Sequence, residues 1–298
     1  MKIKRTVFRF VPRRMRHIFN LQVASEVEGK PLTSPLKNGK ALDGHWLRSW
    51  KTEIIERMCR ARDGAFVDIG ANIGQTMLDH YLTGVAAPYI GFEPNPSCVS
   101  YLNDIIAANS FDRHTILPIG LANETKVVPL YTRRGHAEDD AASLVADLRP
   151  QWAVAAQYVS CHRFDDVRAA LDLKQIAFVK IDVEGFELEV LKGMRETLGD
   201  LRPVVLCEIL FTDAHADLAV NERRNRGIEI LLGELDYKIF QLIKSPDDLR
   251  IVDAKKIEHL SNEILTRENF QLFDYLFVPA SEEIEIVKRL LEKAPDSR

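Results

Sequence analysis

The chain has 298 residues, of which 46% are hydrophobic and 28% are charged, and its formal net charge is −4. This composition is typical of a globular protein with a sizeable core, and it gives no global attraction to nucleic acid or to an anionic membrane. The longest apolar runs have the length of strands, so no transmembrane segment is expected. Four cysteines lie far apart without metal-ligand spacing, which indicates reduced thiols and favours a cytoplasmic protein.

Residues 1–60 are predicted to form a mostly helical N-terminal extension. In the second half of this segment, Trp50, Ile54 and Met58 recur at helical spacing, and Gly64 follows as a stop signal. The first residues are basic, but arginines interrupt them throughout, so they lack the continuous apolar centre of a secretory signal.

Residues 61–282 alternate short apolar runs with amphipathic helical segments. The apolar runs are AFVDIG, YIGFEP, HTILPIG, IAFVKIDVEG and PVVLCEIL. Between the second and third runs, Asn95 is the expected N-cap of a helix that Pro96 opens. Near-continuous apolar runs separated by helices are typical of parallel strands buried on both faces. The pattern therefore predicts an α/β fold with a Rossmann-like, doubly wound, mainly parallel sheet.

Two parts of the chain depart from this alternation. Residues 124–163 contain KVVPLYTR and QYVSCHRF around a polar stretch, and they are interpreted as an inserted hairpin. The runs YKIFQLI and FDYLFVP are expected to be the last two strands. Residues 283–298 are expected to form a C-terminal helix and tail.

An acid follows four of the predicted strands, namely Asp68, Glu93, Asp182 and Glu208. In an open α/β sheet the carboxyl ends of the strands meet at one crevice, where ligands bind. We therefore expect these four carboxylates to lie close together at a ligand site.

The spacing Asp68-x-Gly70-x-x-x-Gly74 differs from both the dinucleotide fingerprint and the P-loop. A carboxylate at Asp68 disfavours a diphosphate and suits a ligand with a cationic amine, while the glycines permit close approach of the backbone. Glu93 ends the next strand, where an acid can accept hydrogen bonds from both hydroxyls of a ribose. A ribose combined with a cationic amino-acid end indicates S-adenosylmethionine as the cofactor.

The segments DIGANIGQT, GFEPNP, VKIDVEGFELEVLKGM and PVVLCEI together resemble the FkbM-family methyltransferases. The resemblance covers about residues 62–280 and implies a class I methyltransferase fold, S-adenosylmethionine as cofactor, and O-methylation of a sugar or natural product. It implies a ribose-binding acid at Glu93, and Asn123 is the one candidate for the adenine contact. The cofactor-binding residues implied by position are Asp68, Gly70, Ala71, Asn72, Gly74, Glu93, Pro94 and Asn95.

The catalytic candidates are Lys180, Asp182 and Glu184, which alternate and would share one face of a strand, together with Glu208. Asp182 or Glu184 would orient the acceptor hydroxyl or remove its proton, and Lys180 would tune the charge. Two alternatives remain open: a purely structural ion pair of Lys180 with Asp182 or Asp68, or a magnesium ion held by Asp182 and Glu208. We expect no metal, because the further carboxylates of a firm site are missing. His215 is a second candidate for the base.

Three functions are compatible with these residues. The leading one is an O-methyltransferase for a small-molecule or glycan acceptor. A nucleic-acid methyltransferase is less compatible, because a phosphate backbone would avoid the acidic IDVEG stretch. A non-catalytic S-adenosylmethionine-binding module is the third.

Overall fold

The computed structural model describes residues 22–36, 49–133, 142–145, 154–212, 217–245, 247, 250–266, 269 and 271–292. Within these ranges the chain is built around an eight-stranded mixed sheet. Its strand order is β12 (Ile251–Ile257), β11 (Tyr237–Lys244), β13 (Asp274–Pro279), β10 (Val205–Glu208), β9 (Ile176–Ile181), β3 (Ala65–Ile69), β4 (Tyr89–Phe92) and β5 (His114–Leu117). The five strands from β10 to β5 are parallel, and β13, β11 and β12 extend the sheet by antiparallel pairing.

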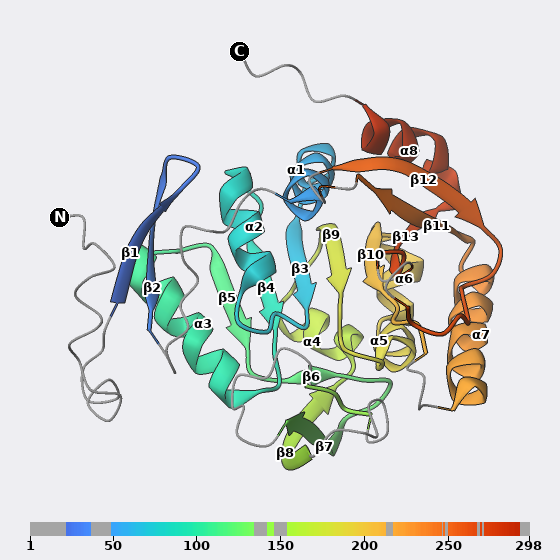
Figure 1. The fold of residues 1–298 in the computed structure, drawn as a ribbon, viewed down its shortest axis with the longest axis horizontal. Coiled ribbons are helices and arrows are strands. Elements are labelled where there is room, and N and C mark those ends of the chain that lie inside the picture. The colour runs from blue at the N-terminus through green and yellow to red at the C-terminus, as the bar shows by residue number, and fades with distance from the viewer. Residues whose placement is uncertain are drawn as a thin grey trace.

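Helices cover both faces of this sheet (Figure 1). The first face packs against α1 (Trp50–Ala61), α2 (Gln75–Thr83), α3 (Pro96–Asn109) and α8 (Glu283–Leu291). The second face packs against α4 (Phe164–Ala170), α5 (Glu187–Gly193), α6 (Arg195–Asp200) and α7 (Leu218–Glu234). Neighbouring residues of β3 point into opposite apolar clusters, Phe66 into the first and Val67 into the second. A strand buried on both sides must be apolar throughout, which explains the continuous runs in the sequence.

Local signals set the ends of the helices next to the site. The Asn95 side chain accepts a hydrogen bond from the amide of Ser97 at 3.0 Å, and Pro96 opens α3. Gly74 and Gly84 flank α2 with φ angles of 100° and 68°, a left-handed conformation that favours glycine. The N-cap that the sequence predicts is therefore found at Asn95.

The N-terminal extension is not mostly helical where the structure describes it. Residues 22–36 contain an antiparallel hairpin of β1 (Gln22–Val27) and β2 (Lys30–Pro35), joined at Glu28 and Gly29. Both turn residues have positive φ, as a two-residue hairpin turn that matches the strand twist requires. Helix α1 is the part of the prediction that is found, and residues 1–21 and 37–48 lie outside the described residues.

The sequence pattern also missed β12 and predicted a single helix where the structure has two. The predicted last strands correspond to β11 and β13, but β12 pairs beside β11 at the sheet edge. Its sequence, IVDAKKI, contains three charged residues and is exposed or half-buried throughout, because an edge strand meets solvent. The helix expected after the KIDVEG segment is interrupted at Met194 and forms α5 and α6.

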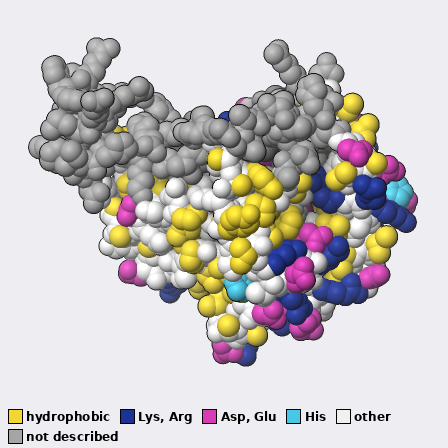
Figure 2. Space-filling view, turned by 90° about the horizontal axis from the view of Figure 1, so that it is seen from below, with side chains coloured by type: hydrophobic (Ala, Val, Ile, Leu, Met, Phe, Trp, Pro, Cys, Tyr) yellow, Lys and Arg dark blue, Asp and Glu magenta, His cyan; other side chains and the backbone are white. Residues whose placement is uncertain are grey.

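The segment 124–163 contributes two strands of a separate three-stranded sheet. Strands β7 (Lys126–Arg133) and β8 (Val154–His162) pair antiparallel, and β8 pairs parallel with β6 (Gly120–Leu121). Residues 134–141 and 146–153 lie outside the described residues. This small sheet lies beyond the ends of the parallel strands (Figure 1), and it carries the exposed Val127 and Tyr158. Hydrophobic side chains gather near the middle of the face seen from below (Figure 2).

Candidate functional site

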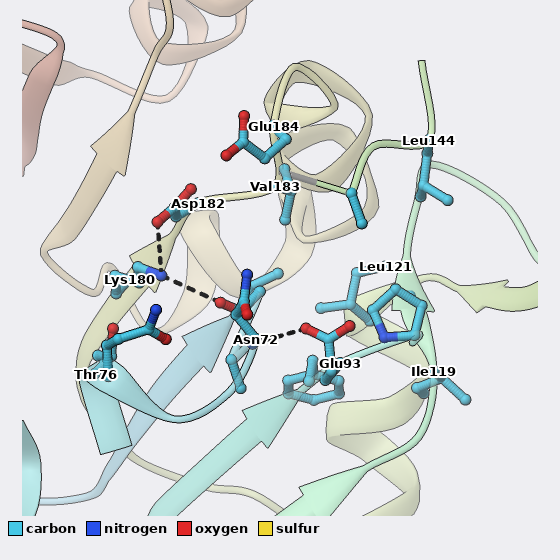
Figure 3. A pocket seen from close by; sticks show the side chains of 18 of the residues that line it. Asn72, Thr76, Glu93, Ile119, Leu121, Leu144, Lys180, Asp182, Val183 and Glu184 are labelled. Atoms are coloured by element: carbon cyan, nitrogen blue, oxygen red, sulfur yellow. Dashed lines mark hydrogen bonds and ion pairs between the residues drawn. The ribbon is translucent and has the colours of Figure 1, made fainter. Parts of the chain in front are cut away.

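A cavity of about 330 Å³ opens at the carboxyl ends of β3, β4 and β9 (Figure 3). Its volume lies in the range of sites for small organic ligands. Each part of the wall comes from a different element of the chain. The lining includes Ser49, Trp50 and Lys51 at the start of α1, Ile69–Asn72 at the end of β3, Phe92–Pro94 at the end of β4, Lys180 and Asp182–Glu184 at the end of β9, and Ile119–Leu121, Leu130, Ala142 and Leu144.

The side chain of Glu93 connects the turn after β3 with the turn after β4 at one end of the cavity. Its Oε2 atom accepts a hydrogen bond from the Asn72 amide, and its Oε1 atom accepts one from the Asn95 amide, both at 2.7 Å. Burial raises the pKa of Glu93 to about 7, although these two amides favour the ionised form. A carboxylate has about four acceptor positions. Glu93 can therefore fix the local backbone and still accept hydrogen bonds from a ligand in the cavity.

Gly70 is required by a contact within the protein as well as by its place in the cavity wall. Its φ angle is 88°, and a Cβ atom there would lie 1.8 Å from the carbonyl oxygen of Asp182. The loop after β9 thus crosses directly over the turn after β3. The sequence led us to expect that Gly70 lets a cofactor approach the backbone. In the structure, the atom that comes close to Gly70 is the carbonyl oxygen of Asp182.

We expect Gly70→Ala to lower the free energy of unfolding by about 2 kcal/mol more than Gly29→Ala. Both glycines have positive φ, but a Cβ atom at Gly29 meets nothing within 4 Å. Backbone strain affects both variants, so the difference between their losses of stability measures the collision with Asp182. Urea denaturation of both variants measures the difference, and equal losses of stability would contradict the contact.

Lys180 connects three oxygen atoms beneath the cavity. Its Nζ atom lies 3.1 Å from Asp182 Oδ2, 3.4 Å from Asp68 Oδ1 and 3.3 Å from the Gly70 carbonyl oxygen. Asp68 is fully buried and also accepts a hydrogen bond from the Tyr89 hydroxyl at 2.5 Å. Lys180 therefore forms the ion pairs with Asp68 and Asp182 that a purely structural role of this lysine would require. Asp68 lies under the turn and is not part of the cavity wall, whereas Asp182 is 25% exposed there.

Asp182 and Glu208 are the carboxyl groups at the ends of the neighbouring strands β9 and β10. Burial raises the pKa of Asp182, but the charges of Lys180 and Lys51 outweigh it, and the pKa lies below its usual value. Burial and the charge of Asp182 raise the pKa of Glu208 well above its usual value. Lys51 Nζ stands 3.9 Å from Glu208 Oε2. Asp182 is therefore the more acidic member of the pair and the one kept ionised.

The structure brings most of the predicted site residues to this region, with a few exceptions. Gly70, Ala71, Asn72, Glu93, Pro94, Lys180, Asp182 and Glu184 line the cavity, whereas Gly74 and Asn95 stand behind the wall as helix caps. Asn123 does not line it, and its Oδ1 atom accepts a hydrogen bond from Lys126 Nζ at 3.0 Å. His215 lies outside the described residues.

The sequence reasoning missed several groups of lining residues, among them Gln75, Thr76 and Asp79 of α2 and two groups from other segments. Ser49, Trp50 and Lys51 come from the start of α1, and Ala142 and Leu144 come from the inserted segment. The Ser49 N-cap signal marks the start of α1, but nothing local shows that this end faces a cavity. The apolar lining residues resemble ordinary core residues in the sequence.

Within the described ranges, no group of three or more His, Cys, Asp or Glu side chains is arranged to hold a metal ion. In the same ranges, none of the helices combines the length and the apolar character needed to cross a membrane.

An open α/β sheet with acids at the strand ends around one cavity defines a protein of the class that binds nucleoside-containing cofactors. A family model described as the methyltransferase FkbM domain matches residues 68–239, more than half of the chain. The chain therefore belongs to the FkbM methyltransferase family and is an S-adenosylmethionine-dependent methyltransferase.

The solved structures to which this chain is similar are distant in sequence. The methyltransferase FkbM from Methylobacillus flagellatus KT is 17% identical, with a TM-score of 0.42, and the match covers 72% of this chain and 43% of that one. The O-methyltransferase TomG from Streptomyces achromogenes, solved with S-adenosylmethionine, is 11% identical, with a TM-score of 0.42 and coverages of 77% and 79%. The search of curated proteins gave no match.

Proposed function

We propose that this protein is a cytoplasmic O-methyltransferase that transfers a methyl group from S-adenosylmethionine to a hydroxyl group of a sugar, glycan or natural-product acceptor. The observation that carries the proposal is the place of Asp182, whose carboxyl group lies in the cavity wall 3.1 Å from Lys180 Nζ. The proposed units are the extension 1–60, the methyltransferase domain 61–282 with its insertion 124–163, and the tail 283–298.

The cofactor fits the chemistry of the wall around Glu93. The carboxylate of Glu93 has acceptor positions for ribose hydroxyls, and its burial would strengthen hydrogen bonds made there. Ile119, Leu121 and Leu144 form the apolar wall on the same side of the cavity (Figure 3) and would contact the adenine ring. These residues replace Asn123 as our assignment for the adenine.

The acceptor is proposed to bind near Asp182 and Glu184, whose carboxylates lie away from Glu93 at the other end of the cavity (Figure 3). When bound, S-adenosylmethionine supplies an electrophilic methyl group. Asp182 would hold the acceptor hydroxyl in line with it and accept the hydroxyl proton. Lys180 would keep Asp182 ionised and oriented, because it fixes Asp182 to Asp68 and to the turn at Gly70.

The two other functions have less support. On the face shown in Figure 2, Lys and Arg side chains are mixed with Asp and Glu, which is unlike the continuous basic surface typical of nucleic-acid binding. Asp182 and Glu184 stand at the acceptor end, and the charge of the Asp182 carboxylate would repel phosphates. In a module that only binds the cofactor, the role of Asp182 would be limited to its ion pair with Lys180.

The proposal is tested by binding first and by transfer second. We expect calorimetry to show micromolar binding of S-adenosylhomocysteine, about −8 kcal/mol. We then expect a labelled methyl group to appear on a member of a panel of sugars, glycans and phenolic or polyketide alcohols. Transfer to an RNA or DNA oligonucleotide would favour the nucleic-acid alternative. Binding without transfer to any member of the panel would favour the non-catalytic module.

A further inference from the structure

The inserted segment closes one side of the cavity with a four-residue stretch, residues 142–145. Ala142 and Leu144 of this stretch line the cavity, as does Leu130 of β7. The intervening Ser143 is 5% exposed and does not line the cavity itself. Two apolar side chains of the wall therefore flank one buried hydroxyl group.

Ser143 is held on two sides. Its backbone makes a reciprocal pair of hydrogen bonds with Tyr131 of β7, at 2.8 and 3.0 Å. Its hydroxyl group donates to the carbonyl oxygen of Glu184 at 2.6 Å and accepts from the Val145 amide at 3.0 Å. The hydroxyl thus connects the insertion directly to the loop that follows β9, which also lines the cavity.

The peptide that receives this hydrogen bond is itself fixed. The Glu184 carbonyl and the Gly185 amide belong to one peptide unit, and that amide donates to Oε1 of the buried Glu187 at 2.8 Å. Arg224 of α7 donates to the next carbonyl, that of Gly185, at 2.8 Å. Glu184 and Gly185 have φ angles of 52° and 98°, a conformation that these contacts stabilise. Ser143 therefore attaches the insertion to a rigid part of the site.

We propose that Ser143 is a positioning residue that fastens residues 142–145 to the Glu184–Gly185 peptide and so holds Ala142 and Leu144 against the bound cofactor. This inference rests on the proposed function, because it takes the cavity to be the cofactor site. The hydroxyl group of Ser143 does not touch the cofactor. It acts by keeping the apolar wall closed, which slows the escape of the ligand.

The test uses the full chain and S-adenosylhomocysteine as the probe. We expect Ser143→Ala to raise the dissociation constant by about 5–20-fold, the usual effect of losing one buried hydrogen bond. Ser143→Thr keeps the hydroxyl group and is expected to stay within about threefold of the wild type. Ser160→Ala is the matched control, since this exposed serine of the same insertion contacts His162 and does not line the cavity.

The outcomes separate this inference from the proposed function. Failure of the wild-type protein to bind S-adenosylhomocysteine would contradict the cofactor assignment and the inference with it. Wild-type binding with an unchanged dissociation constant in a folded Ser143→Ala protein would overturn the positioning role alone. Thermal unfolding without ligand shows whether the variants are folded. Binding by Ser143→Thr as weak as that by Ser143→Ala would also contradict the role of the hydroxyl.

Discussion

Replacing Asp182 with asparagine is expected to slow methyl transfer by about 10²–10⁴-fold, the usual contribution of a general base. Asparagine keeps the size of the side chain but cannot accept the hydroxyl proton. The affinity for S-adenosylhomocysteine is expected to stay within about threefold, because the ribose and adenine contacts are proposed at the other end of the cavity. Steady-state rates with the acceptor found in the panel, and calorimetry with the product, measure the two quantities.

Asp172→Asn is the control for this variant. Asp172 precedes the opposite end of β9 and pairs with Lys174 in solvent, so its loss should leave the rate unchanged. A chelator distinguishes the magnesium alternative: loss of activity that added magnesium restores would assign Asp182 and Glu208 to an ion. Full activity in Asp182→Asn would leave the Lys180 ion pairs as a structural cluster and direct the search for the base to His215.

Replacing Glu93 with glutamine is expected to weaken the binding of S-adenosylhomocysteine by about 30–100-fold, or about 2–3 kcal/mol. Both carboxylate oxygens accept backbone amides, from Asn72 and Asn95. The NH₂ group of glutamine would face the N–H group of a backbone amide, so one of these two hydrogen bonds would be lost. Glutamine would also remove the negative charge to which a ribose hydroxyl donates. Glu124→Gln is the control, because the Glu124 side chain is 66% exposed. Unchanged affinity in a folded Glu93→Gln protein would exclude the ribose assignment.

The raised pKa of Glu93 gives this prediction a pH dependence. Donation by ribose hydroxyls favours the ionised carboxylate, so the affinity for S-adenosylhomocysteine should rise as the pH increases through about 7. The free energy of unfolding should change in the opposite direction. The native state binds this proton more tightly than the unfolded state, so the contribution of Glu93 falls between its ordinary value of 4.5 and about 7. Both trends should disappear in Glu93→Gln.

The main fold and much of the site could be predicted from local features of the sequence. Strands buried on both faces must be apolar, and helices between them must be amphipathic, so their order predicts a doubly wound sheet. Once that sheet is predicted, the carboxyl ends of its parallel strands share one edge. Glu93 and Asp182 could be placed together at a cavity for this reason, although they are almost ninety residues apart in the chain.

The remaining features depend on contacts between distant segments. Gly70 carries a glycine signal in the sequence, but only the fold shows that the Asp182 carbonyl occupies the space of its missing Cβ atom. The start of α1 reaches the cavity because Asp79 of α2 accepts a hydrogen bond from Thr52 at 2.5 Å, a contact between two helices. Strand β12 and the bond from Ser143 to Glu184 are likewise pairings between segments. The sequence determined which elements form and which of their ends carry acids, since these follow from neighbouring residues. Only the tertiary structure decided which further side chains close the cavity, because that depends on how separate elements pack.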